Sequence, residues 1–195
     1  MITQQPDLCR VWNNVEKPIG TTQLMIQAND NWNKYNKLIQ CLNHNGYIVY
    51  VAKHNHDDNT TDIAEKIIAK HKLPLVLIAN EFDTQQIKNF TTNTSLFDAV
   101  ISVAEIPGSR WWNRMIWRRF LRLENHAPIL IINGGINLCK TCGRLSRTLH
   151  SAYTDYDPNK LTVILYPDIC PQNLIDNQNK ETQDDILNFL NDIKK

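Results

Sequence analysis

The sequence has no long hydrophobic run and almost no net charge. None of its apolar stretches approaches the roughly 20 residues that a membrane-spanning helix requires. Its 21 Lys and Arg residues balance 20 Asp and Glu residues, so no global electric field favours nucleic acid. Residues 1–10 are polar and lack the basic start and apolar core of a signal peptide. These absences predict a soluble, cytoplasmic protein, and we expect no specific nucleic-acid partner.

Cysteine is scarce and odd in number. The chain has five cysteines and no recognisable export signal, so we expect reduced thiols rather than a disulfide framework. A chain of 195 residues can bury a substantial core without such cross-links. No repeat period or low-complexity linker divides it. The sequence therefore predicts one domain over residues 1–195.

Short apolar runs alternate with amphipathic segments about six times along the chain. The most apolar of these runs, 75–79, precedes a polar bend at 80–83 and an amphipathic segment at 84–90. A continuous apolar run of this length is typical of a central parallel strand that is covered on both faces. The alternation predicts an α/β fold with a mostly parallel sheet and helices on both faces, in three α/β/α layers.

The individual elements are expected from the period of their apolar residues. The predicted strands are 8–12, 23–27, 47–52, 75–79, 99–103, 128–132 and 161–166. The predicted helices are 32–44, 62–71, 84–90, 145–153 and 182–193. Either Asp30 or Asn31 is expected to cap the first helix, and Asn45 with Gly46 is expected to end it.

Several segments resemble those of one enzyme family in the same order. They are Trp32-Asn-Lys-Tyr35, Leu73-Pro74 through Asp83, Phe97-Asp98-Ala-Val-Ile101, Pro128 through Asn137, and Tyr166-Pro167. In this order they resemble the α/β-hydrolase fold, specifically its monoacylglycerol lipase and lysophospholipase branch of the serine aminopeptidase S33 type. The resemblance extends over nearly the whole chain. It implies an ancestral site with a serine nucleophile, an acid and a histidine.

The positions that carry the family's chemistry are all changed. The resemblance places the serine at Glu81, the acid at Asn137, the histidine at Pro171, and the oxyanion-hole region at Ala28 and Phe82. Acyl transfer needs a nucleophile, a base and oxyanion donors together. The resemblance therefore implies a degenerate pseudoenzyme that binds rather than catalyses, and no catalytic residue is expected.

The bend after the central strand lacks the family's glycines. Ala79 and Asp83 stand where the family has glycine on either side of its nucleophile. Because glycine permits a strained turn, we expect the bend at Glu81 to be relaxed. A carboxylate nucleophile at Glu81 would still need a histidine to activate water, and Pro171 removes the expected one. We therefore interpret Glu81 as a solvated or capping glutamate.

A short basic and aromatic segment, 105–127, replaces the family's large cap. Its arginines recur at every fourth residue, which aligns them on one side of a helix. The predicted binding surface comprises Arg110, Trp111, Trp112, Arg114, Arg118, Arg119 and Arg122. Such a surface fits an anionic membrane or an acidic protein. The alternative is a cap remnant that packs its aromatic side on the sheet and solvates its arginines.

Two further hypotheses rest on the cysteines. Cys139 and Cys142 form a C-x-x-C pair, and His150 with Cys170 could complete a tetrahedral zinc site in an interaction module. Alternatively, Cys139 or Cys142 with His150 could serve as relocated catalytic residues of a lipid-ester or thioester hydrolase. Incidental free cysteines remain the favoured interpretation. We therefore expect no metal and no cofactor.

Overall fold

A computed structural model describes residues 9–27, 29–54, 60–81, 96–104, 127–135, 161–175 and 179–193. Its strands form one seven-stranded sheet in the order β1-β3-β2-β4-β5-β6-β7. They are β1 (Cys9–Trp12), β2 (Gly20–Gln27), β3 (Tyr47–His54), β4 (Leu75–Asn80), β5 (Ala99–Val103), β6 (Ile129–Gly134) and β7 (Leu161–Tyr166). Strand β1 is antiparallel to β3, and the other neighbouring strands are parallel. The predicted mostly parallel sheet is confirmed.

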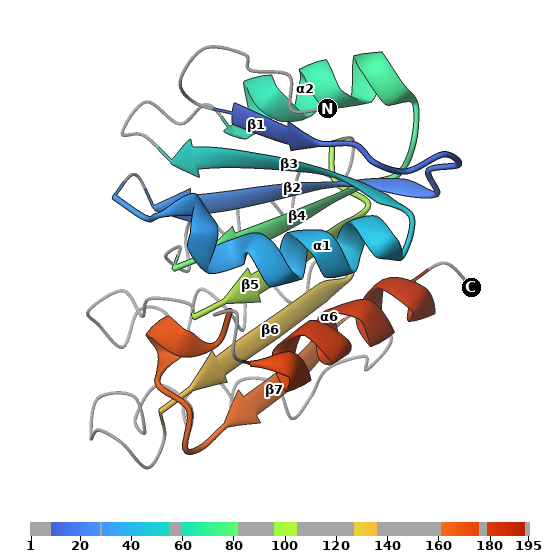
Figure 1. Ribbon diagram of the computed structural model, residues 1–195. Coiled ribbons are helices and arrows are strands. Elements are labelled where there is room, and N and C mark those ends of the chain that lie inside the picture. The colour runs from blue at the N-terminus through green and yellow to red at the C-terminus, as the bar shows by residue number, and fades with distance from the viewer. Residues whose placement is uncertain are drawn as a thin grey trace.

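Helices cover both faces of this sheet. The described helices are η1 (Trp32–Tyr35), α1 (Asn36–His44), α2 (Thr60–His71), η2 (Pro171–Asn173) and α6 (Lys180–Asp192). Helices α1 and α6 lie side by side in front of the sheet (Figure 1), and both contribute to one apolar cluster. Helix α2 contributes to a second cluster. The predicted α/β/α layering is therefore confirmed.

The central strand β4 has apolar side chains on both of its faces. Val76 and Ile78 belong to the cluster under α1 and α6, whereas Leu75 and Leu77 belong to the cluster on the α2 side. Burial of each of these side chains contributes about 1.5–3 kcal/mol. Double coverage explains why this strand reads as an unbroken apolar run rather than an alternating one.

Helix boundaries follow local capping chemistry. The side chain of Asn31 accepts a hydrogen bond from the backbone N–H of Asn33 at 3.0 Å, so Asn31 caps the first helical turn. Gly46, with φ of 89°, follows the end of α1 as predicted. Helix α6 begins earlier than the predicted residue 182, because the side chain of Asn179 accepts from the N–H of Thr182.

The strands 99–103 and 161–166 are found at their predicted positions. Strand β2 begins three residues before the prediction, because Gly20 to Thr22 also pair with β3. The predicted helices 84–90 and 145–153 lie outside the described residues, as does the basic segment except residue 127.

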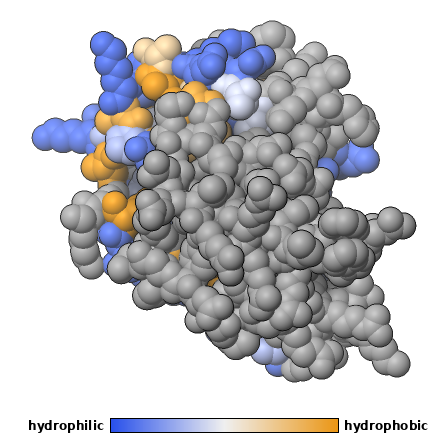
Figure 2. Space-filling view, turned by 180° about the vertical axis from the view of Figure 1, so that it is seen from behind, coloured by the Kyte–Doolittle hydropathy of each residue, from blue (hydrophilic) through white to orange (hydrophobic). Residues whose placement is uncertain are grey.

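Most large hydrophobic side chains of the described residues are buried or partly buried. Among the described residues, Ile19 is the one large hydrophobic residue that is exposed, at 48%. The described part of the rear surface mixes hydrophilic and hydrophobic residues (Figure 2). None of the described helices has the length and apolar character that crossing a membrane would require.

Candidate functional site

The carboxyl ends of β2 to β7 meet at one edge of the sheet, at the left of Figure 1. Glu81 lies at this edge, directly after β4, with a left-handed backbone φ of 61°. Its N–H donates to the carbonyl of Val103 at 2.9 Å, and its carbonyl accepts from Nε2 of Gln27 at 2.9 Å. The expectation of a relaxed bend is therefore wrong. Hydrogen bonds from both neighbouring strands hold the left-handed conformation without glycine.

Two other strands end in the same way. Ala104 after β5 has φ of 54°, and Gly135 after β6 has φ of 77°. The N–H of Ala104 donates to the carbonyl of Ile132 at 2.9 Å, and that of Gly135 donates to Tyr166 at 3.1 Å. Each exit residue thus satisfies its amide on the next strand while the chain turns away. At a non-glycine residue this conformation costs about 1–2 kcal/mol.

A buried hydrogen-bonded chain lies beside Glu81. Asn80, the last residue of β4, donates through Nδ2 to the hydroxyl oxygen of Tyr35 at 3.0 Å. The same hydroxyl donates to a carboxylate oxygen of Asp30. Asn80 is 1% exposed and Tyr35 is fully buried. The contacts therefore fasten η1 to the end of the central strand and hold Asp30 at this edge.

The electrostatics of the cluster favour the protonated forms of Glu81 and Tyr35. Burial raises the pKa of Glu81, the Lys34 ammonium opposes this shift, and the nearby Asp30 carboxylate adds to it. Burial, followed by the hydrogen bond to Asp30, raises the pKa of Tyr35 far above its ordinary value. Tyr35 therefore stays protonated, and Glu81 holds a proton more readily than a solvated glutamate.

Pro171 is the residue that the sequence resemblance aligns with the family's histidine. It is the first residue of η2, and Cys170 precedes it as the N-cap. The backbone of this region runs close to β6, because a Cβ on Gly134 would lie 2.4 Å from the carbonyl oxygen of Ile169. Residue 171 therefore belongs to the carboxyl edge of the sheet. Its pyrrolidine ring cannot transfer a proton.

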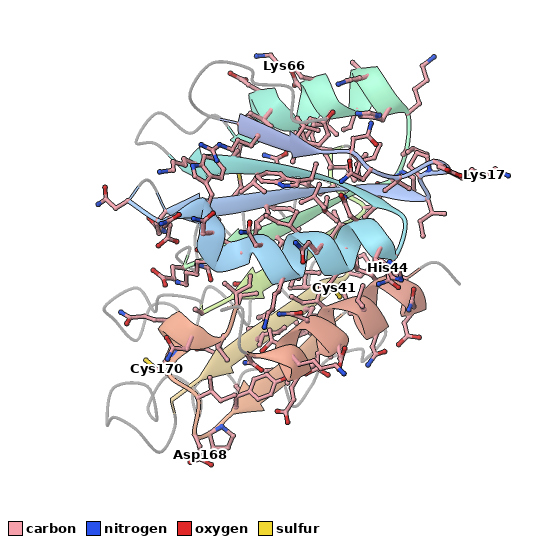
Figure 3. The ribbon with its side chains drawn as sticks, in the orientation of Figure 1. Lys17, Cys41, His44, Lys66, Asp168 and Cys170 are labelled. Carbon is pink, nitrogen blue, oxygen red and sulfur yellow. The ribbon has the colours of Figure 1, made fainter. Side chains whose placement is uncertain are left out.

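The described cysteines are separate free thiols. Cys170 lies near η2, whereas Cys41 lies on α1 on the side toward α6 (Figure 3). Among the described residues, no three His, Cys, Asp or Glu side chains form a group that could hold a metal ion. Most other predicted site residues lie outside the described residues: Ala28, Phe82, Arg110, Trp111, Trp112, Arg114, Arg118, Arg119, Arg122, Asn137, Cys139, Cys142 and His150.

Sequence reasoning missed the participation of Tyr35 and Lys34. The sequence places Tyr35 within the predicted helix 32–44 and offers Asp30 only as a possible helix cap. The structure assigns the cap to Asn31 and uses Asp30 as the acceptor for the Tyr35 hydroxyl. The sequence signal that could have indicated this contact is the polar break after β2. It places Asp30 only five residues before Tyr35, at the end of a strand.

Comparisons with known proteins reveal a likeness of fold. No protein-family model matches the sequence, and no curated protein matches it. TT1662 from Thermus thermophilus is similar with a TM-score of 0.66 and 10% identity, over 100% of this chain and 99% of that one. The esterase domain of a Rhodothermus marinus protein gives 0.65 and 9%, over 94% and 89% of the two chains. A monoacylglycerol lipase from Paleococcus ferrophilus gives 0.62 and 14%, over 94% and 98%.

Proposed function

Because the chain has the fold of α/β-hydrolases, we propose that it is a non-catalytic protein of that fold which acts by binding. The observation that carries this proposal is the identity of the residue at the bend after β4. A serine there could donate its hydroxyl proton to a base and attack an acyl carbon. Glu81, which the sequence resemblance aligns with the family's serine, has no such hydroxyl.

The surroundings of Glu81 support the same conclusion. After burial itself, the described groups that act most strongly on its carboxyl are Lys34 and Asp30, and neither of these is an imidazole. Pro171, which the sequence resemblance aligns with the family's base, is a proline at the start of η2. Neither position has a hydroxyl nucleophile or a histidine, so the proton transfer that begins serine-type hydrolysis cannot take place there.

An ester-hydrolysis assay tests the non-catalytic part of the proposal. Purified wild-type protein and Glu81→Gln would be compared on short-chain and medium-chain p-nitrophenyl esters and on a monoacylglycerol. We expect both proteins to match the buffer rate. Turnover by the wild type that disappears in Glu81→Gln, with folding verified by circular dichroism, would overturn the proposal.

A specific observation favours one second candidate, hydrolysis with Glu81 as a carboxylate nucleophile. Glu81 keeps the left-handed bend that displays a side chain at a strand exit, and Asp30 acts on it electrostatically. In that reaction a Glu81 carboxylate oxygen would displace a leaving group from a saturated carbon of the substrate and form an ester with that carbon. A water that loses its proton to Asp30 would then attack the ester carbonyl, which releases the substrate as an alcohol and restores the Glu81 carboxylate. The variant Asp30→Asn distinguishes this hydrolysis from the non-catalytic proposal. It should trap the covalent ester, visible by mass spectrometry, only if this candidate is correct.

The binding part of the proposal concerns the segment 110–122. Its regularly spaced arginines and aromatic residues support contact with an anionic membrane or an acidic protein. Flotation with phosphatidylserine vesicles at low and high salt tests the membrane version. The double variant Arg114→Ser and Arg118→Ser should reduce flotation, and neutral vesicles should give none. Failure of the wild type to float at low salt would exclude the membrane and leave an acidic protein as the partner.

A further inference from the structure

A groove lies between helix α1 and the segment that follows β1. Its volume is about 320 Å³, within the usual range of small-molecule sites. The lining residues are Trp12, Asn14, Asn36, Ile39, Gln40, Asn43 and His44. His44 lies at the end of α1 away from the carboxyl edge of the parallel strands (Figure 3). Because Glu81 lies at that carboxyl edge, the groove is separate from the site described above.

One wall of the groove is a row of hydrogen-bonding side chains along α1. Asn36, Gln40, Asn43 and His44 are spaced by four, three and one residues, which places them on one side of the helix. From the first to the last of them the helix rises about 12 Å. The groove therefore presents donors and acceptors in a line, rather than a single polar point.

Asn43 fixes the two walls against each other. Its Nδ2 donates to the carbonyl of Trp12 at 3.1 Å and to the carbonyl of Tyr47 at 2.7 Å. Both amide hydrogens are used in these bonds, so the side chain is held in one orientation and Oδ1 is left as its acceptor. The position of the Trp12 backbone is thereby set before any ligand binds. Preorganisation of this kind reduces the entropic cost of binding.

The apolar part of the lining comes from two residues. Ile39 is 1% exposed, and Trp12 is half-buried and packs against the apolar cluster under α1. An indole presents a rigid apolar surface together with one N–H donor. Such a surface packs well against the C–H groups of a flat ring, while neighbouring amides bond to its hydroxyls.

The chemistry of the lining selects a class of ligand. None of the seven residues is an aspartate, glutamate, lysine or arginine, so a charged ligand would lose its hydration without gaining a counter-charge. Side-chain amides both donate and accept, as sugar hydroxyls do. We propose that this groove is a binding site for a neutral saccharide of about two sugar rings. This inference is independent of the function proposed for the Glu81 edge.

A titration followed by nuclear magnetic resonance tests the proposal. Four neutral disaccharides serve as probes: maltose, cellobiose, lactose and diacetylchitobiose. At tens of millimolar, at least one should shift the indole N–H of Trp12 and the side-chain amides of Asn36 and Gln40. Trp12→Phe assigns the indole signal among the five tryptophans. Shifts confined to other parts of the protein, or no shift with any probe, would overturn the proposal.

A matched pair of variants checks the site. Gln40 is exposed, so Gln40→Ala should leave the fold intact and weaken binding about fivefold through the loss of one hydrogen bond. Lys37→Ala, an exposed position on α1 outside the lining, should leave affinity unchanged. Equal affinity of Gln40→Ala and wild type would count against the groove. Tighter binding of glucuronate or adenosine at the same amides would contradict the assignment to a neutral sugar.

Discussion

The side-chain amide of Asn80 donates a hydrogen bond to the hydroxyl oxygen of Tyr35 over 3.0 Å, in a setting where both residues are buried. This bond joins the last residue of the central strand to η1, although the two residues are 45 positions apart. Because the Tyr35 hydroxyl then donates to Asp30, the chain of bonds fixes one side of the Glu81 edge. Loss of the hydroxyl would therefore disturb two partners at once.

Tyr35→Phe should destabilise the protein by about 1–3 kcal/mol. The substitution keeps the ring but leaves the buried amide of Asn80 without its acceptor and Asp30 without its donor. Urea unfolding followed by fluorescence would measure the change.

A double-mutant cycle with Asn80→Leu isolates the pair. If the hydrogen bond is energetically coupled, the double variant should lose less stability than the sum of the two single variants. Strict additivity would show that the Asn80–Tyr35 contact contributes nothing of its own.

Glu81→Gln should raise stability at neutral pH. Burial raises the pKa of Glu81 above 4.5, so the folded protein binds this proton more readily than the unfolded chain. The favourable contribution is complete below the unfolded pKa and is lost as the pH rises through the folded value. A neutral amide escapes this loss. The gain should be small, because much of the side chain remains in water.

The pH dependence of the Glu81→Gln effect provides the check. Unfolding free energies of the two proteins should converge at about pH 4 and separate toward about pH 7. Lys34→Met should enlarge the separation, since the Lys34 ammonium stabilises the ionised carboxylate. A variant that is less stable than wild type at neutral pH would show that the carboxylate makes a net favourable contact.

Lys72→Gly should stabilise the protein by about 0.5–1 kcal/mol. Lys72 follows α2 with a φ of 54°, and its N–H donates to the carbonyl of Ile68 at 3.0 Å. Glycine adopts this left-handed helix end without the steric cost of a Cβ. Thermal unfolding would report the difference.

Lys66→Gly is the matched control for that substitution. Lys66 is also an exposed lysine but lies within α2 (Figure 3), so the same change should destabilise by about 1 kcal/mol. Opposite signs at the two lysines would confirm that backbone conformation, rather than charge, decides the effect. Loss of stability at both positions would contradict it.

His71 should make stability depend on mildly acidic pH. Its Nε2 lies 2.5 Å from the Tyr50 hydroxyl, and its pKa is lowered from 6.5, first by burial and then by the Lys70 ammonium. The unfolded chain therefore binds this proton more readily than the folded protein. The contribution is complete above the unfolded pKa and is lost as the pH falls through it toward the folded value.

Two variants isolate the His71 effect in urea unfolding between about pH 7.5 and about pH 5. His71→Gln should flatten the pH dependence, because its amide does not titrate and still reaches a hydroxyl. Lys70→Gln should reduce it in part, since it removes the second cause of the lowered pKa. An unchanged slope in His71→Gln would exclude this histidine as the source.

The order of elements could be predicted from the sequence because burial leaves a period in it. The central run 75–79 is apolar throughout because β4 is covered on both faces, and the predicted strands 99–103 and 161–166 coincide with β5 and β7. The position of Glu81 at the exit of β4 can be predicted from the sequence as well, because the apolar run ends there. A strand end followed by a polar bend marks where a side chain is displayed.

The sequence by itself determined the α/β layers, the central strand and the position of Glu81 at its exit. Only the tertiary structure decided the left-handed backbone of Glu81, the Asn80–Tyr35 bond and the groove beside Trp12. The physical reason is that each depends on partners distant in the chain: Val103 for Glu81, Tyr35 for Asn80 and α1 for Trp12. Periodicity records which side of an element is buried, whereas strand register and helix placement determine which groups meet.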